Sequence, residues 1–286
     1  MAKNPFKFGT DLWDPSHRFQ TSWLVSPYVL FATRVALSLY AFVVILTVLG
    51  LECENPTLGG CAEARDEFSY FTVLTYWGLA FYHGVSAFHT FSYARWGVTP
   101  LERWPRPLQA LHALFYTTVT TFPFVVTIVF WSLLSSPATL ATRYSAWSNI
   151  SQHGLNSAYA LFEIIVPRTN PPPWVHIFWL IVLLALYLAL AYLTFATKGF
   201  YTYDFLDPRL QGAKVAAYVF GIGVGIVIIF VFVWGLIWLR KWITEKKLGL
   251  DGKFAEHRGN GSAGGRRVKH ENHEMENTSP DASTFA

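Results

Sequence analysis

The sequence predicts an all-α fold, a polytopic transmembrane helix bundle with six spans. Hydrophobic residues make up 52% of the 286 residues and aromatic residues 17%, while charged residues make up only 14%; ordinary soluble domains carry about a quarter of charged residues. Six apolar stretches are long enough to cross the hydrocarbon core of a bilayer, which takes about 20 helical residues. The breaks between them are rich in proline, glycine and charge, which interrupt helices.

The expected spans cover residues 28–50, 68–93, 108–134, 147–166, 174–197 and 215–239. They divide the chain into a cytosolic N-terminal segment (1–27), a transmembrane domain (28–239) and a disordered cytosolic tail (240–286), whose polar composition lacks apolar periodicity. The fourth span is the most polar, and it contains Ser148, Asn149, Gln152, His153 and Glu163. A span of this kind is stable when its polar face lies against the bundle or a cavity.

The distribution of Lys and Arg predicts that both termini face the cytosol. Eleven basic residues flank the spans on that side: Lys3, Lys7, Arg18, Arg95, Arg103, Arg106, Arg168, Arg240, Lys241, Lys246 and Lys247. Five lie on the other side: Arg65, Arg143, Lys198, Arg209 and Lys214. Basic residues concentrate in cytosolic flanks, and only the loop between spans five and six, with three of the five, opposes this orientation. We expect an endoplasmic reticulum or other endomembrane protein, with the plasma membrane as the alternative.

The two cysteines of the sequence, Cys53 and Cys61, both fall in the first non-cytosolic loop. An oxidising lumen permits disulfides, so their C-x7-C spacing predicts a disulfide bond, with two free thiols as the alternative.

Two ionisable residues lie inside the expected spans at comparable depth. Arg34 is about seven residues from the cytosolic end of span one, where a long side chain can extend to the headgroups, and we expect it to do so. Glu163 lies near the cytosolic end of span four, so a buried ion pair between the two is the alternative.

A hydroxyl and an imidazole at equal depth suggest a catalytic pair. Thr75 in span two and His153 in span four are each about seven residues, or on the order of 10 Å, below the lumenal end. An imidazole can activate a hydroxyl as a nucleophile, and Thr72, one turn shallower, is not excluded by depth. Asn149 and Asn156 stand four residues before and three residues after His153, on its face of a regular helix.

Four ordered segments carry a resemblance to a known family. They are FTVLTYW, FPFVVTIVFWSLL, QHGLNSAYALFEII and GFYTYDFLDP. The chain resembles the androgen-induced (FAR/AIG-like) family of integral membrane proteins, which includes the androgen-dependent TFPI-regulating protein. The resemblance aligns the family's threonine with Thr75 and its histidine with His153. The chain departs from the family where Asn156 replaces a second histidine and Asp204 replaces a proline.

The resemblance implies a membrane-embedded threonine hydrolase that cleaves lipid esters, with fatty acid esters of hydroxy fatty acids as the substrates. Thr75 would be the nucleophile and His153 the general base. The oxyanion donor stays open, and Asn149 and Asn156 are candidates only because they lie near His153. We expect the substrate to be a lipid from the bilayer, and we expect no cofactor, no metal and no nucleic-acid partner. The oligomeric state stays open.

Two other functions remain open from the residues alone. A non-catalytic or transport protein would use the polar fourth span to line a solute or proton path. A haem-binding electron carrier would need histidine pairs on facing helices, which His83, His112, His153 and His176 are available to supply.

Overall fold

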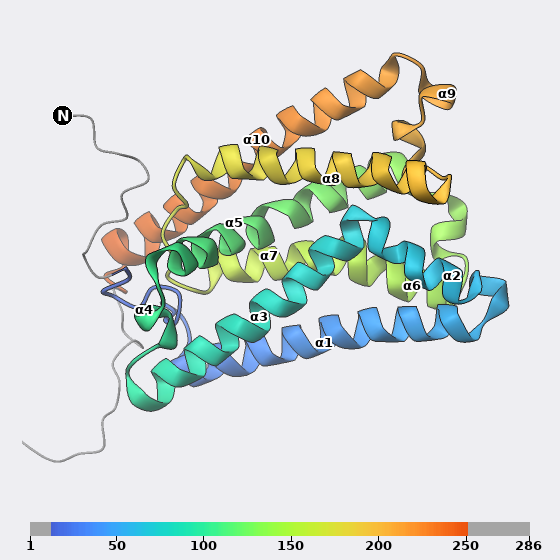
Figure 1. Ribbon diagram of the computed structural model, residues 1–286. Helices are drawn as coiled ribbons and strands as arrows, with labels where there is room; N and C mark the ends of the chain where they lie inside the picture. The colour runs from blue at the N-terminus through green and yellow to red at the C-terminus, as the bar shows by residue number, and fades with distance from the viewer. Residues whose placement is uncertain (1–12, 251–286) are drawn as a thin grey trace, which may run out of the picture.

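The computed structural model describes residues 13–250, and this part of the chain is all-α. The helices run along one common direction (Figure 1). Their bounds are α1 Pro27–Glu54, α2 Gly60–Asp66, α3 Phe71–Trp96, α4 Pro100–Arg103, α5 Arg106–Val129, α6 Arg143–Ile150, α7 Asn156–Ile165, α8 His176–Lys198, α9 Pro208–Gln211 and α10 Lys214–Lys241. Three π-helical turns extend them: Phe130–Leu134 continues α5, Ser151–Leu155 joins α6 to α7, and Trp242–Lys247 continues α10.

Four helices of the described chain are long and apolar enough to cross a membrane: Pro27–Glu54, Arg106–Leu134, His176–Lys198 and Lys214–Lys247. They indicate a multi-pass membrane protein. The expected second and fourth spans correspond to α3 and to the α6–α7 segment, which lie alongside the other helices but carry more polar residues.

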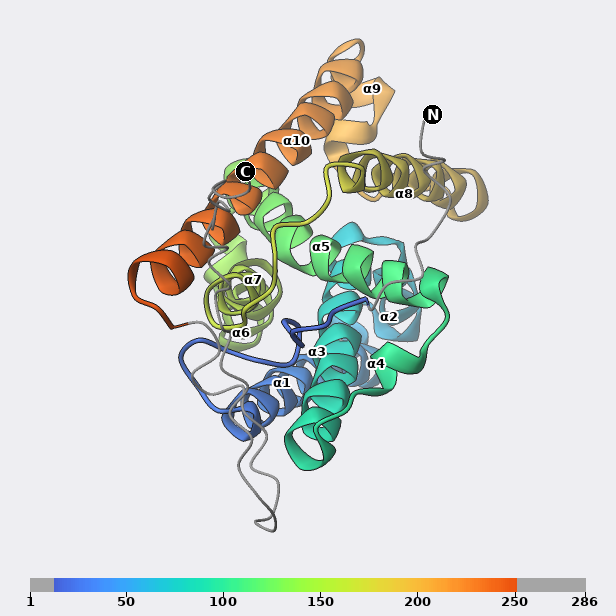
Figure 2. The same ribbon diagram turned by 90° about the vertical axis from the view of Figure 1, so that its left-hand side faces the viewer.

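Helix α5 runs through the middle of the bundle. The end-on view places α1 and α3 on one side of it, α8 and α10 on the other, and α6 and α7 beside it (Figure 2). The α1–α3 contact is close because Gly84 has no side chain: a Cβ there would lie 3.2 Å from the Ser38 hydroxyl, which donates to the Ala80 carbonyl of α3 at 2.9 Å. The main apolar core lies among α1, α3, α5, α7 and α10, and a second one lies among α5, α8 and α10.

Local sequence explains where the long helices begin and end. Helix α1 starts at Pro27 with the Ser26 side chain accepting from the Val29 amide, because proline suits the first helical turn and serine caps it. Helices α3 and α8 end at Gly97 and Gly199, whose φ angles of 72° and 83° lie in the left-handed region that glycine tolerates best.

Both flanks of the described chain meet at one end of the bundle. Arg18 forms an ion pair with Glu245. The Arg168 amide donates to the Thr21 carbonyl at 2.9 Å, and Ser22 and Pro167 form an isolated antiparallel bridge. Residues 240–247, which the expected division placed in the tail, are helical; residues 1–12 and the rest of the expected tail from 251 lie outside the described residues.

Arg34 does not extend to the headgroups, so the expectation of snorkelling was wrong. Its guanidinium binds the Glu163 carboxylate through two hydrogen bonds of 2.8 and 2.7 Å, and both residues are fully buried. The Arg34 side chain also donates to the Phe19 carbonyl and to the Thr90 hydroxyl. A charged guanidinium with this set of partners needs no path to water.

Cys53 and Cys61 are joined by a disulfide, as their spacing predicts. The bond ties the end of α1 to the start of α2, at the end of the bundle opposite α4 (Figure 1).

Candidate functional site

The two expected catalytic residues line different cavities of the described chain. Thr75 is half-buried and lines a cavity of about 600 Å³ between α3, α5 and α8, and its hydroxyl donates back to the Thr72 carbonyl at 3.0 Å. His153 lines a second cavity of about 550 Å³, which we call the polar chamber. Thr72, the hydroxyl one turn before Thr75, lines this chamber together with His153.

Two π-helical turns position His153. The residue lies in the turn Ser151–Leu155, and its imidazole stacks on the ring of Phe130, from the turn Phe130–Leu134, with 3.5 Å between the ring centroids. The Trp131 indole donates to the His153 carbonyl at 3.0 Å. Such turns are rare and occur often at functional sites. Here they bring the two helices together at a single imidazole.

A backbone carbonyl fixes the orientation of the His153 ring. Its Nδ1 lies 3.1 Å from the Asn149 carbonyl oxygen, which can only accept a hydrogen bond. Nδ1 therefore carries the proton in this arrangement, and Nε2 keeps its lone pair. An imidazole oriented in this way is suited to act as a base through Nε2.

The polar chamber lies at the end of the bundle that carries α2. Its walls come from α1, the loop around α2, the start of α3, the π-helical turn after α5, α6 and the π-helical turn after it, and Tyr203. Six of its polar side chains besides Thr72 and His153 are Glu52, Glu67, Tyr144, Ser148, Asn149 and Gln152. No Lys or Arg appears among the described residues that line it.

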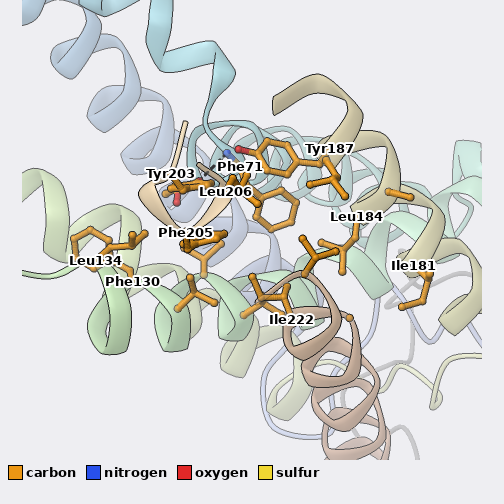
Figure 3. A pocket seen from close by; sticks show the side chains of 18 residues that line it. Phe71, Phe130, Leu134, Ile181, Leu184, Tyr187, Tyr203, Phe205, Leu206 and Ile222 are labelled. Atoms are coloured by element: carbon orange, nitrogen blue, oxygen red, sulfur yellow. Dashed lines mark hydrogen bonds between the residues drawn. The ribbon is translucent and has the colours of Figure 1, made fainter. Parts of the chain in front are cut away.

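An apolar cavity of about 220 Å³ adjoins the polar chamber. Figure 3 shows its wall, with Leu184, Ile181 and Ile222 around it and Tyr203 and Phe130 toward one end. The two cavities share four lining residues: Thr72, Phe130, Leu134 and Tyr203. Thr72 therefore lies where an apolar space meets a polar one.

Tyr203 lies beside Thr72 at this boundary. The Phe71 amide donates to the Tyr203 hydroxyl at 3.1 Å, and the Thr72 side chain lies within hydrogen-bonding reach of the same phenol. Burial raises the pKa of Tyr203 well above its usual value, and the nearby Tyr187 adds to this effect. The phenol is therefore neutral at physiological pH and keeps a proton to donate.

Two carboxylates give the chamber an acidic wall. The Glu52 side chain is 9% exposed; one of its oxygens accepts from the Tyr144 hydroxyl at 3.3 Å, and the other is buried with no partner within the described chain. Burial raises the pKa of Glu67 to about 8, with further contributions from Glu52 and Glu63. Close carboxylates disfavour each other's charged form, so this wall accepts a hydrogen-bond donor readily and an anion poorly.

The two asparagines expected to assist catalysis lie in different places. Asn149 lines the polar chamber, and its amide donates to the Ser145 carbonyl at 2.9 Å. Asn156 is buried against α5, where it accepts from the Thr127 hydroxyl at 3.0 Å. The wider π-helical turn between them removes the regular helical spacing that had placed both on one face.

Two of the histidines that a haem protein would need, His83 and His112, lie next to the same residue, Tyr82. The Nδ1 atom of His83 bonds the Leu79 carbonyl, His112 packs against Tyr82, and His176 bonds the Thr117 hydroxyl. Within residues 13–250 no cluster of three or more His, Cys, Asp or Glu side chains has the arrangement of a metal site.

Sequence reasoning missed four residues of the chamber: Glu52, Glu67, Phe130 and Tyr203. All four lie at helix ends or in loops, where hydropathy carries no signal about tertiary neighbours. Phe130 and Tyr203 lie in two of the segments that carry the resemblance, but the place of Tyr203 beside Thr72 depends on how the loop after α8 folds back on α3. Compared with known protein families, curated proteins and solved structures, the chain matches none of them.

Proposed function

We propose that this chain is a membrane-embedded hydrolase of ester lipids, with Thr72 as the nucleophile and His153 as the base. The main observation behind the proposal is the place of Thr72, which lines both the apolar cavity and the polar chamber that His153 also lines. An ester lipid fits these two cavities in polarity, because its acyl chain is apolar and its ester and headgroup are polar. The resemblance to the androgen-induced family suggests esters of hydroxy fatty acids as the first substrates to test, although it aligns the family's threonine with Thr75.

The proposal assigns the nucleophile to Thr72 in place of Thr75. A base acts on a hydroxyl that it reaches directly or through one water. Thr72 shares the polar chamber with His153, whereas the Thr75 hydroxyl lies in another cavity and is engaged with the Thr72 carbonyl.

The reaction follows from these positions. His153 takes the proton of the Thr72 hydroxyl at Nε2 while the oxygen attacks the ester carbonyl, and the bond to the leaving alcohol breaks as that alcohol takes the proton. In the second step the same imidazole takes a proton from water, whose oxygen attacks the acyl-threonine carbonyl. The bond to the Thr72 oxygen breaks as that oxygen takes the proton back, and the fatty acid is released. The phenol of Tyr203 donates a hydrogen bond to the oxyanion, and the Phe71 amide that donates to its oxygen strengthens this donor.

We also propose that the chain crosses the membrane six times with both termini in the cytosol. The meeting of the two flanks at one end of the bundle supports an even number of spans. The test is the accessibility of single cysteines, introduced into a Cys53→Ser/Cys61→Ser background, to a membrane-impermeant thiol reagent in sealed microsomes. Labelling at Lys246→Cys with protection at Glu63→Cys is expected, and the reverse pattern would overturn the orientation.

The catalytic proposal is tested by comparing Thr72→Ala, Thr75→Ala and His153→Gln in detergent or nanodiscs. We expect Thr72→Ala and His153→Gln to lower ester hydrolysis by at least about 10²-fold and to abolish labelling by a fluorophosphonate probe. Thr75→Ala is the matched control, because it also removes a threonine hydroxyl from α3, one turn away from Thr72. This variant should keep most of the activity. Peptide mapping should find the probe on Thr72.

Three results would count against the proposal. Full activity in Thr72→Ala would show that Thr72 is not the nucleophile. Loss of activity only in Thr75→Ala would show that the nucleophile is Thr75. A wild-type protein that hydrolyses no ester lipid would refute the function itself.

A further inference from the structure

Two glutamates in the wall of the polar chamber restrict the charge that the polar end of a substrate can carry. In a lipid bound with its acyl chain in the apolar cavity and its ester at Thr72, the remaining part of the molecule extends into the polar chamber. The apolar cavity offers only the hydroxyls of Thr72, Tyr187 and Tyr203 as polar groups. Any charge on the substrate therefore lies in the chamber, close to its wall.

That wall carries two carboxyl groups without a basic counterpart. Glu52 and Glu67 both line the chamber, and no Lys or Arg is among its described lining residues. The buried second oxygen of Glu52, which has no hydrogen-bond partner in residues 13–250, is an acceptor that a ligand hydroxyl or amide would satisfy. A carboxylate placed there would meet a carboxyl group and no basic side chain among the described lining residues.

We propose that Glu52 and Glu67 make the chamber selective for ester lipids whose polar end is an uncharged hydrogen-bond donor, and that an ester with a free carboxylate is the poorer substrate. This inference rests on the proposed ester hydrolysis and narrows its substrate class. Among esters of hydroxy fatty acids it favours forms in which the free carboxyl is blocked, and it places hydroxyl-bearing acylglycerols within the preferred class.

The test uses two substrates with the same scissile bond. One is the palmitate ester of a hydroxystearic acid with its free carboxyl, and the other is the corresponding primary amide, which has nearly the same size but no charge. The quantity measured is the ratio of kcat/KM for the amide to kcat/KM for the acid, at about pH 9, where Glu67 is ionised. Both rates come from one preparation, so the ratio does not depend on the fraction of active protein.

We expect the wild-type ratio to be at least about tenfold, the effect of roughly one unit of pKa shift from a neighbouring like charge. Glu52→Gln/Glu67→Gln should bring the ratio to within about threefold of one, chiefly by improving hydrolysis of the acid. Glu54→Gln is the matched control, because Glu54 is exposed at the same end of α1 and does not line the chamber. It should keep the wild-type ratio.

Two outcomes would overturn the inference and leave ester hydrolysis intact. In one, wild-type protein cleaves the acid as well as the amide. In the other, the ratio is the same in the double variant and the wild type, with probe labelling showing that the site is formed. Absence of hydrolysis of both substrates by the wild type would instead refute the proposed function. If the double variant fails to fold, Glu67→Gln alone should still lower the ratio, because this half-buried side chain is outside the core.

Discussion

Removing the Glu163 carboxylate should destabilise the protein more than any single change at its surface. Arg34 and Glu163 are held by two hydrogen bonds of 2.8 and 2.7 Å, with 1% and 0% of their side chains exposed. In Glu163→Ala the guanidinium stays buried and keeps only the Phe19 carbonyl and the Thr90 hydroxyl as partners. Leaving a buried charge without its counterion costs about 3–5 kcal/mol.

A second variant separates the cost of an unpaired charge from the value of the pair. Arg34→Met/Glu163→Leu removes both charges and fills similar volumes, which is often near neutral for a buried pair. In this protein it also leaves the Phe19 carbonyl without its donor, a loss of about 1–3 kcal/mol. The double variant should therefore be more stable than Glu163→Ala, although it removes more of the native interactions.

The assay is thermal unfolding followed by tryptophan fluorescence, since the chain has 12 Trp. A loss of 3–5 kcal/mol corresponds to a decrease in Tm of about 6–20 °C for a chain of this size class. Lys198→Met is the control: it breaks the Lys198–Asp66 pair, of similar length at 2.7 Å but with 38% and 28% of the side chains exposed, and should cost about 0–1 kcal/mol. A double variant as unstable as Glu163→Ala would refute the reasoning.

Three further predictions concern the polar chamber and its surroundings. Cys53→Ser/Cys61→Ser should lower the free energy of unfolding by about 2–3 kcal/mol, from the entropy of closing a loop of this length, and an unchanged melting curve would show that packing alone holds the loop. The preference for the amide over the acid should grow as the pH rises from about 7 to 9, because the pKa of Glu67 is about 8 and its charge appears in this range. An equally steep rise of this preference with pH in Glu67→Gln would contradict the prediction. Tyr203→Phe should lower kcat by about 10²-fold through loss of the oxyanion donor, with KM and probe binding nearly unchanged. Full activity in this variant would show that Tyr203 takes no part in the reaction.

The sequence predicts the helices well because hydropathy is a local property. The helices that could cross a membrane correspond to expected spans, and the C-x7-C spacing predicts the disulfide. The environment of Arg34 could not be read in the same way. A snorkelling and a paired arginine have the same local sequence, and the difference depends on a carboxylate 129 residues away.

The choice between Thr72 and Thr75 shows a second limit. Three residues along a helix differ in direction by about 60°, so both hydroxyls point toward the same broad side of α3. Which one shares a cavity with His153 depends on the rotation of α3 relative to its neighbours, and that rotation is set by packing such as the close approach at Gly84. The π-helical turn at His153 has no sequence signature that would have predicted it.

The buried Arg34–Glu163 pair has a consequence for biosynthesis. The two residues are 129 positions apart, and a ribosome adds about 5–20 residues per second, so Arg34 is synthesised about 6–26 seconds before its partner. Throughout that interval the first helix has no counterion for its guanidinium, which favours a shallow or tilted placement near the membrane surface. We therefore expect the first helix to reach its final depth only when the segment carrying Glu163 arrives, and the N-terminal segment to dock later still, because Arg18 binds Glu245. Assembly of this bundle is completed from the part of the chain that is synthesised last.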